Sequence, residues 1–403
     1  MQLQPKSFPR FFSIFHPETP CFRILIAFCL LASLAKPTWA KANSVHKYFV
    51  YVGTYNVRGS RGIYAYSFDP ANGHLARLGL QAEITNPSYI TVAPNRPFLY
   101  AVSEIDNYQG RPSGALSAYR TDAKTGALTL LNRVSSLGTG PCYLSLDKTG
   151  KFAFSANYDS GNVAVFPLLP DGKLGDASAS VQQRGSSINA DRQKGPHAHC
   201  IETTFDNRYV IVADLGLDQL LVYKFDSTQG SLSPSAPGYE KVQGGAGPRH
   251  FVFHPNHGYL YLVNEMESSV SVFSYDAGQG TLQEKQTISA LPQDFKQKSD
   301  AAEIQIDTAG RFVYVSNRGP DSITVFRVSP TNGTLEVVET VPSGGKTPRY
   351  FAIDPSGKFL LVANQDSDNI VTFRIDRESG KLSKVSETGS VISPVSLAFL
   401  EAK

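Results

Sequence analysis

Cysteine, methionine and tryptophan are scarce in this chain of 403 residues, which contains four, two and one of them, respectively. So little cysteine excludes a small disulfide-stabilised scaffold, which carries far more cysteine per residue. Only Cys142 and Cys200 lie beyond the first 40 residues. The repeats described below place both near strand starts in adjacent units. We expect that separation to exceed the bridging distance, although a pairing in an oxidising compartment is the alternative.

Long apolar runs are also rare, and the one that stands out, Ile24–Ala35, is too short to span a bilayer. Basic residues precede it, and it is followed by Thr38–Ala40, which supplies small residues at a cleavage position. This pattern predicts a signal peptide over residues 1–40, with an uncleaved anchor as the alternative. We therefore expect a secreted or periplasmic mature protein, formed by residues 41–403, without stable membrane insertion.

An excess of charge of one sign is missing as well. The formal net charge of +3 comes from the N-terminal segment, whose removal takes away four basic residues and one acidic residue and leaves 34 of each sign. Proteins that bind nucleic acid or membrane surfaces normally carry a basic excess. We therefore expect neither kind of partner.

A template of apolar strands, rich in Val, Phe and Tyr and separated by turns, recurs along the rest of the chain. Gly247–Phe273 shows it most clearly, as a strand, a turn, a second strand, a polar loop and a third strand. An aromatic residue opens the second strand of each copy, at intervals of about 50 residues, the period of propeller blades. These residues are Tyr48, Phe98, Phe152, Tyr209, Tyr259, Phe312 and Phe359.

A turn that follows each third strand gives the same count. An acidic residue or asparagine is followed by glycine, one further residue and leucine, and such a turn leads into a fourth strand. The glycines are Gly73, Gly126, Gly172, Gly230, Gly280, Gly333 and Gly380. We therefore predict an all-β fold, a seven-bladed β-propeller whose blades are four-stranded antiparallel sheets.

The two ends of the mature chain are predicted to share one blade. Pro394–Phe399 resembles a first strand such as Pro348–Ile353, whereas the mature chain begins with a second strand at Tyr48–Val52. The C-terminal strand would complete the blade that the N-terminal strands open, so no free sheet edge would remain at the seam. We expect the ring to be a monomer.

One rim of the predicted ring gathers the residues that could do chemistry. The start of each first strand and the end of each second strand lie on the same rim, because adjacent strands run antiparallel, and first strands line the central channel. Binding sites in rings of repeats form by such convergence. The repeat places there His197, His199, Arg249, His250, Glu265, Glu303, Arg318, Arg349 and Glu104.

Two polar stretches exceed the repeat in length and are predicted to lie over the same rim. Phe166–His197 carries the longest insertion, and Glu104–Gly114 extends the loop between the second and third strands of its blade. Polar loops of this length often act as lids or binding loops. An uninvolved surface loop is the alternative for each.

The arginines and glutamates of this rim suit anion binding and acid–base chemistry. Arg249 with Glu265, and Arg318 with Glu303, occupy corresponding positions in adjacent blades. A guanidinium matches a carboxylate, a phosphate or a developing oxyanion, although such pairs can also be plain ion pairs between blades. A carboxylate among arginines acts as a base only if burial or another acid offsets its lowered pKa.

The histidines raise two further possibilities, a metal site and a serine nucleophile. Strand alternation predicts that only one of His197 and His199 faces the channel. Three histidines and two glutamates could suggest a metal, but acids that flank arginines are poor ligands, so we expect no metal and no other cofactor. A serine nucleophile lacks support, because the Gly-x-Ser-x-Gly elbow is missing.

Five segments give the chain a specific resemblance to a known family. They are Gly195–Cys200, Gly244–Asn256, Tyr261–Glu265, Ala301–Ile323 and Thr347–Gln365. On these segments the chain resembles the seven-bladed lactonases, which include 6-phosphogluconolactonase and the fungal carboxymuconate-cyclising enzyme. The likeness spans nearly all of residues 48–400. It implies a site formed by His197 or His199 together with Arg249, Glu265 and Arg318.

We therefore expect hydrolysis of a small-molecule sugar-acid lactone at this mouth by metal-independent general acid–base catalysis. The alternatives are a non-catalytic propeller that binds a sugar acid or a partner protein, and an activity of the muconate-lactone cyclase type. The expected catalytic residues are His197, His199, Arg249, Glu265 and Arg318, and the expected substrate-binding residues are His250, Glu303, Arg349 and Glu104.

Overall fold

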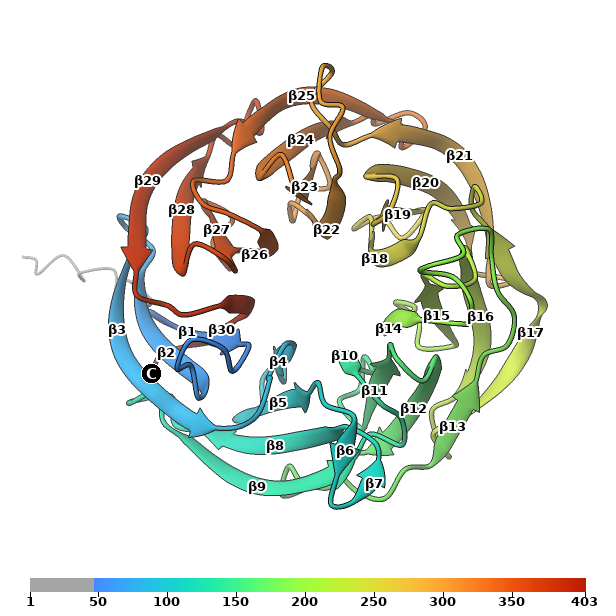
Figure 1. The fold of residues 1–403 in the computed structure, drawn as a ribbon, viewed down its shortest axis with the longest axis horizontal. Helices are drawn as coiled ribbons and strands as arrows, with labels where there is room; N and C mark the ends of the chain where they lie inside the picture. Colours follow the sequence, from blue (N-terminus) through green and yellow to red (C-terminus); the bar gives the residue numbers. More distant parts are fainter. Residues whose placement is uncertain (1–46) are drawn as a thin grey trace, which may run out of the picture. The chain divides into compact units, whose positions relative to one another are not determined.

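The computed structural model describes residues 47–403, so the signal peptide predicted for residues 1–40 lies outside the described residues. The described chain forms seven four-stranded antiparallel sheets, arranged around a central opening (Figure 1). No helix occurs among these residues. The prediction of a seven-bladed β-propeller is confirmed.

The first two strands of each blade lie nearest the centre (Figure 1). The first strands are β4 (Ile90–Val92), β10 (Pro141–Leu146), β14 (Ala198–Thr203), β18 (Pro248–Phe253), β22 (Asp300–Ile306), β26 (Pro348–Ile353) and β30 (Pro394–Glu401). The second strands are β1 (Tyr48–Thr54), β5 (Phe98–Ser103), β11 (Phe152–Asn157), β15 (Tyr209–Asp214), β19 (Tyr259–Asn264), β23 (Phe312–Arg318) and β27 (Phe359–Asn364). Every second strand begins at the aromatic residue that the repeat predicted.

The third and fourth strands lie toward the outside of the ring (Figure 1). The third strands are β2 (Gly62–Asp69), β8 (Ala115–Thr121), β12 (Asn162–Pro167), β16 (Gln219–Asp226), β20 (Ser269–Asp276), β24 (Ser322–Val328) and β28 (Asn369–Ile375). The fourth strands are β3 (His74–Glu83), β9 (Leu128–Ser135), β13 (Ala179–Gln182), β17 (Ser231–Lys241), β21 (Thr281–Ser289), β25 (Leu335–Pro342) and β29 (Leu382–Gly389).

Both long loops contain strands, of which the sequence predicted only the fourth strand of the blade that follows the turn at Gly172. The stretch Glu104–Gly114 carries a small hairpin of β6 (Asn107–Tyr108) and β7 (Arg111–Pro112). The predicted insertion Phe166–His197 is shorter than expected, because its middle part forms β13, the outer strand of its blade. Only the segment after β13 is an extra loop.

Burial explains the different sequence character of inner and outer strands. Every residue of β27 is buried, because blades pack against both of its faces, whereas β29 mixes exposed and partly buried residues. A strand that is covered on both faces is uniformly apolar, and one that faces water is not. The strong repeat in the second strands therefore comes from their position between blades.

The ring closes as the sequence predicted. Strand β30 pairs antiparallel with β1, from Tyr48 opposite Glu401 to Thr54 opposite Pro394, and the sheet order is β3-β2-β1-β30. The last strand of the chain is thus the first strand of the blade that the N-terminal strands open. This pairing leaves no unpaired strand edge at the seam.

The two sequence markers of the repeat contact each other between neighbouring blades. A Cβ atom built on Gly280 would lie 2.5 Å from the ring of Tyr209, which opens the second strand of the preceding blade. The turn glycines meet the opening aromatic in this way at six boundaries, and at the seventh Gly126 meets Phe49. The aromatic residue and the glycine therefore recur together, because the aromatic ring occupies the space that a side chain at the glycine position would need.

We expect Gly280→Ala to destabilise the ring more than Gly150→Ala. Both glycines have positive φ angles, +69° and +67°, but nothing lies within 4 Å of a Cβ atom on Gly150. Backbone strain alone costs about 1–2 kcal/mol, and forcing a methyl group against Tyr209 adds about 1–3 kcal/mol. Urea unfolding of both variants measures the difference. Equal midpoints would contradict the packing role of the glycine.

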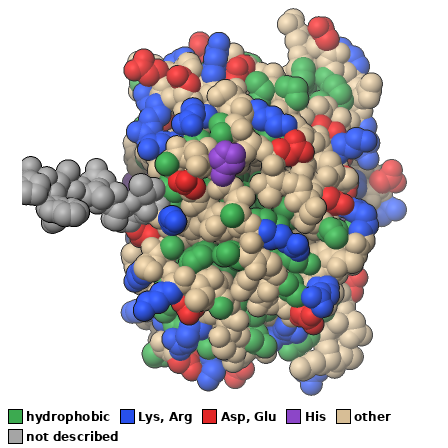
Figure 2. Space-filling model, turned by 90° about the vertical axis from the view of Figure 1, so that its left-hand side faces the viewer, with side chains coloured by type: hydrophobic (Ala, Val, Ile, Leu, Met, Phe, Trp, Pro, Cys, Tyr) green, Lys and Arg blue, Asp and Glu red, His purple; other side chains and the backbone are tan. Residues whose placement is uncertain are grey.

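Charge is balanced on the visible surface, in agreement with the composition. Figure 2 shows one side of the ring, on which basic and acidic side chains are interspersed. Within residues 47–403, no helix has the length and apolar character needed to cross a membrane.

Candidate active site

A β-bulge at the start of the first strand aims a side chain over the mouth of the channel in four blades. In each of them the pairing with the second strand skips one residue, which is left without a partner in the ladder. A bulge re-aims the side chain of the extra residue. The four extra residues are Cys142, His199, Arg249 and Arg349.

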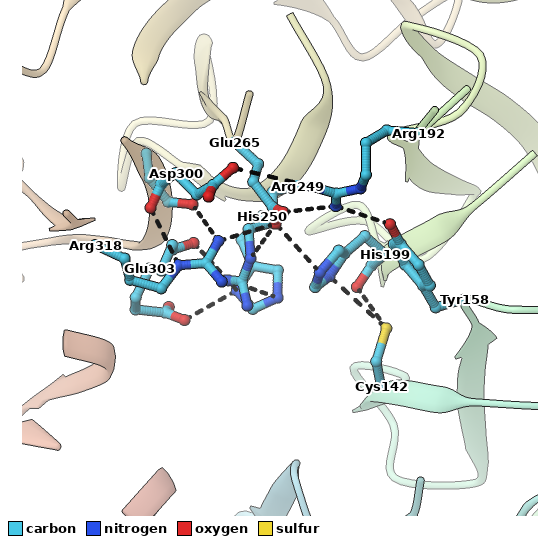
Figure 3. Close-up of polar contacts among 12 residues, drawn as sticks. Cys142, Tyr158, Arg192, His199, Arg249, His250, Glu265, Asp300, Glu303 and Arg318 are labelled. Atoms are coloured by element: carbon cyan, nitrogen blue, oxygen red, sulfur yellow. Dashed lines mark hydrogen bonds and ion pairs between the residues drawn. The ribbon is translucent and has the colours of Figure 1, made fainter. Parts of the chain in front are cut away.

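The ends of the second strands supply the remaining central groups. Glu265 directly follows β19, and Arg318 ends β23 in the next blade. Asp300 begins β22 and lies in the same cluster (Figure 3). Residues that are far apart in the sequence therefore meet at one end of the channel.

Glu265 is the centre of this cluster, and its side chain is only 6% exposed. Its Oε2 atom lies 3.0 Å from Arg249 Nε, 3.2 Å from Arg318 Nη2 and 3.7 Å from His199 Nε2. Its Oε1 atom accepts a hydrogen bond of 2.8 Å from Arg192 Nη2 (Figure 3). One buried carboxylate thus organises three guanidinium groups and an imidazole.

The protonation states follow from burial and from these neighbours. Burial alone would raise the pKa of Glu265, but the charges of Arg318 and Arg249 outweigh it and hold that pKa far below its ordinary value. Burial, reinforced by Arg249, lowers the pKa of His199 well below 6.5. At neutral pH the site therefore holds an ionised Glu265 beside a neutral His199.

Arg249 and Arg318 are each anchored through several of their donors. Arg249 binds Glu265 through Nε and the carbonyl of Ala302 through Nη1. Arg318 donates from Nε to the carbonyl of Asp300 at 3.1 Å and from Nη2 to that of Ala301 at 3.0 Å. Burial and the nearby arginines lower the pKa of Arg318 to about 10, so it stays charged at neutral pH.

Arg349 differs from them because it makes no hydrogen bond or ion pair with any other residue of the described chain. Its guanidinium lies 5.3 Å from the ring centre of Tyr55, whose hydroxyl donates to both carboxylate oxygens of Glu104. The ring of Tyr55, which is itself bound to the carboxylate of Glu104, holds the cation in place without occupying its N–H donors. Arg349 is therefore free to bind a ligand.

His250 and Glu303 form a buried pair in the same cluster, alongside Arg249. His250 Nδ1 lies 2.9 Å from Glu303 Oε2. Burial raises the pKa of Glu303 to about 8, and burial together with Arg249 lowers the pKa of His250. Both shifts favour the uncharged forms of this buried pair.

His197 and His199 have different surroundings, as strand alternation predicted. His199 is buried beside Glu265, whereas His197 stacks on Tyr158 with ring centres 4.5 Å apart. The Nδ1 atom of His197 is 2.8 Å from the carbonyl oxygen of Tyr158. His199 is therefore the histidine in contact with the central carboxylate.

A cavity of about 250 Å³ opens over this cluster. Its lining includes five of the nine residues proposed from the sequence and excludes His197, Arg249, His250 and Glu303. Its lining consists of Glu104, Cys142, Tyr158, Arg192, His199, Glu265, Asp300, Arg318 and Arg349. The cavity thus brings one carboxylate base, one neutral imidazole and one unoccupied guanidinium to the same space.

The family model described as "Lactonase, 7-bladed beta-propeller" matches residues 49–399. The chain belongs to this lactonase family. The resemblance seen in the sequence is thereby confirmed, as is the expectation of a lactonase.

This lactonase is similar to proteins that are named 6-phosphogluconolactonase or gluconolactonase. The 6-phosphogluconolactonase of Bacillus subtilis is 39% identical over 305 residues, which are 76% of this chain and 84% of that protein. The 6-phosphogluconolactonase of Formosa agariphila is 35% identical over 309 residues, or 75% and 86% of the two chains. The structure of a periplasmic gluconolactonase of Pseudomonas aeruginosa is similar with a TM-score of 0.83 and 34% identity. That similarity covers 89% of this chain and all of the other.

Four residues that line the cavity of the lactonase were not among the site residues proposed from the sequence: Cys142, Tyr158, Arg192 and Asp300. Arg192 lies in the loop after β13, which has no counterpart in the other blades, so the repeat could not assign it a position. Asp300 begins β22, three residues before Glu303, which is the residue that the repeat placed on the rim in this strand. The prediction that the long loop lies over the mouth was the only signal for Arg192.

Possible metal ligands and free thiols are the other reactive groups to consider in the described part of the lactonase. No group of three or more His, Cys, Asp and Glu side chains in residues 47–403 is arranged to hold a metal ion. Cys142 and Cys200 are both buried free thiols. Burial raises the pKa of the Cys142 thiol, so it stays protonated at neutral pH.

Proposed function

We propose that this protein hydrolyses a sugar-acid lactone in the periplasm or outside the cell. One observation carries the proposal. An ionised, buried Glu265 and the unoccupied guanidinium of Arg349 line the same cavity of about 250 Å³. This combination offers a proton acceptor and a donor for a developing oxyanion in one space.

In the proposed reaction Glu265 is the general base. Its lowered pKa makes it a weak base, which is sufficient because lactones of sugar acids open readily. It accepts a proton from a water molecule that attacks the lactone carbonyl carbon. The bond between that carbon and the ring oxygen then breaks, and the ring oxygen takes a proton and becomes a hydroxyl group. Oε1 is the oxygen suited to this role, because Oε2 is already bound by Arg249 and Arg318.

Arg349 supplies the oxyanion donor in this proposal. Its free N–H groups can bind the carbonyl oxygen and bind it more strongly as negative charge develops, which lowers the barrier. Arg249 and Arg318 instead hold Glu265 in position, because both contact its Oε2 atom and are themselves anchored to backbone carbonyls.

His199 is placed to assist the transfer of the proton. Its Nε2 atom is 3.7 Å from Glu265 Oε2, and its lowered pKa keeps it neutral, so it can take up a proton briefly and release it to the leaving oxygen. No metal is required for these steps. A lactone hydrolase of this kind uses only side chains and water.

The proposed location rests on the predicted signal peptide over residues 1–40. A periplasmic gluconolactonase is among the similar solved structures. Together they support an extracytoplasmic substrate of the gluconolactone class.

A pH-stat assay tests the proposed function. The purified mature protein is expected to open gluconolactone or 6-phosphogluconolactone faster than the buffer alone. Rates equal to the spontaneous rate for both, and for carboxymuconolactone, would contradict hydrolysis. Calorimetry with gluconate separates the non-catalytic alternative, which predicts tight binding of the acid without turnover of any lactone.

A further inference from the structure

Arg192 is the one cation in contact with Glu265 that comes from outside the blade repeat. We propose that Arg192 gates the catalytic carboxylate by occupying Glu265 Oε1 in the free enzyme and withdrawing toward Asp300 when the substrate enters. This inference rests on the proposed function of Glu265 as the base. It makes Arg192 a positioning residue that controls access to the reacting oxygen.

The two oxygens of Glu265 have different partners. Oε2 is bound by Arg249 and Arg318 and has His199 nearby, whereas Arg192 is the only described side chain within hydrogen-bonding distance of Oε1. The oxygen left for a water molecule is therefore the one that Arg192 covers. A water molecule can reach Oε1 as a hydrogen-bond donor only after Arg192 has moved.

Arg192 is also the guanidinium best able to move. Its side chain is 38% exposed, compared with 3% for Arg249 and 16% for Arg318. Its other hydrogen-bond partner is the hydroxyl of Tyr158, at 2.9 Å. Because water can reach the guanidinium of Arg192, breaking its ion pair with Glu265 costs less free energy than breaking a pair that is buried on both sides.

The backbone that carries Arg192 is held on both sides, so the motion belongs to the side chain. The side-chain oxygen of Asn189 accepts hydrogen bonds from the N–H groups of Asp191 and Arg192. Gln193 is fully buried and donates to the carbonyl of Leu215 at 2.8 Å. The loop is therefore a fixed base for a long, flexible side chain.

Asp300 provides a second partner for the guanidinium. Its Oδ1 atom is 3.9 Å from Arg192 Nη1, and its side chain is 26% exposed. Arg192 and Asp300 line both the inner cavity and a neighbouring outer cavity of about 470 Å³. The guanidinium can thus leave Glu265 toward open space without losing a carboxylate partner.

Withdrawal of Arg192 would have two consequences for catalysis. The inner cavity of about 250 Å³ would join the outer one, and small-molecule sites usually measure about 300–1,000 Å³. Loss of one neighbouring cation would also raise the pKa of Glu265 toward its ordinary value, because a nearby cation favours the ionised form. A stronger base is a better proton acceptor in the reaction.

Kinetics of Arg192→Ala on gluconolactone test the gate, with Arg184→Ala as the matched control. Arg184 is an exposed arginine of the same loop, and it lines neither cavity. For Arg192→Ala we expect KM to fall about tenfold with kcat retained within about threefold, because a closed gate reduces the apparent affinity in proportion to its occupancy. Arg184→Ala should match the wild type. A higher KM or a large loss of kcat in Arg192→Ala would overturn the gate, because either result means that Arg192 acts on the bound substrate.

A crystal structure of the wild-type enzyme with gluconate provides a readout independent of turnover. We expect Arg192 to lie within hydrogen-bonding distance of Asp300 and away from Glu265 Oε1. Gluconate bound with Arg192 still on Oε1 would refute the gate while leaving hydrolysis intact. Absence of lactone hydrolysis in the pH-stat assay, with Arg192 displaced by gluconate, would instead refute the proposed function alone.

Discussion

Replacement of Glu265 by glutamine is expected to lower kcat/KM for gluconolactone by about 10²–10⁴-fold, the usual contribution of a positioned general base. Glutamine has nearly the same shape but cannot accept the proton of the attacking water. Of the other two carboxylates that line the cavity, Glu104 is bound by the Tyr55 hydroxyl and Asp300 lies 3.9 Å from Arg192 Nη1. Initial rates in a pH-stat measure the effect.

The same substitution leaves three guanidinium groups without their shared anion. Removing one partner of a buried ion pair costs about 3–5 kcal/mol of unfolding free energy, so the folded fraction has to be measured by circular dichroism beside the rate. Glu284→Gln is the matched control, since Glu284 is an exposed glutamate on β21 of the same blade and lines neither cavity. It should retain wild-type activity.

Rescue by formate tests whether Glu265 acts as a base or only holds the arginines in position. In Glu265→Ala, a small carboxylate that occupies the vacated space is expected to restore part of the rate as its concentration rises. A folded Glu265→Gln variant with a rate within threefold of the wild type would refute the assignment of the base.

Replacement of Arg349 by alanine is expected to lower kcat by about 10²–10³-fold, the loss seen when one oxyanion donor is removed. The physical reason is that Arg349 is the cavity guanidinium without a hydrogen bond or ion pair to another described residue. Its interaction with the substrate oxygen strengthens as charge develops, so kcat should fall more than KM changes. Steady-state rates over a range of substrate concentrations measure the two separately.

Two further variants define the role of Arg349. Arg349→Lys keeps the charge but not the planar fork, so it should recover only part of the rate. Lys346→Ala removes an exposed cation from the segment before β26 and should leave kcat unchanged. A higher KM with an unchanged kcat in Arg349→Ala would show that this arginine binds the ground state equally well and is not the oxyanion donor.

The sequence also predicted which side chains would meet at the mouth, for a simple reason. Equivalent positions in successive blades occupy equivalent places around the ring, so Cys142, His199, Arg249 and Arg349 could be aligned before their contacts were known. The structure adds that all four are bulge residues, which explains their common orientation. The bulge has no signature in the sequence, because it depends on how the first strand pairs with the second.

Side-chain partners could not be predicted in the same way. Arg249 and Arg318 were expected to be catalytic, and Arg349 to bind the substrate. The structure adds that Arg249 and Arg318 donate to Glu265 or to backbone carbonyls, whereas Arg349 makes no hydrogen bond to another described residue. Arg192 was overlooked because its loop has no equivalent in the other blades. These roles depend on distances of a few ångströms between side chains, and the spacing of the repeats does not predict such distances.

The amino-acid sequence by itself determined the number of blades, the strand that closes the ring and the rim on which the polar residues gather. It could do so because every blade must bury the same apolar second strand and turn back at the same glycine. The tertiary structure alone decided that Glu265 is the shared anion, that His199 rather than His197 accompanies it, and that Arg192 covers its remaining oxygen. Those facts arise from packing between distant segments, where burial and neighbouring charges set which groups are ionised and which donors remain free.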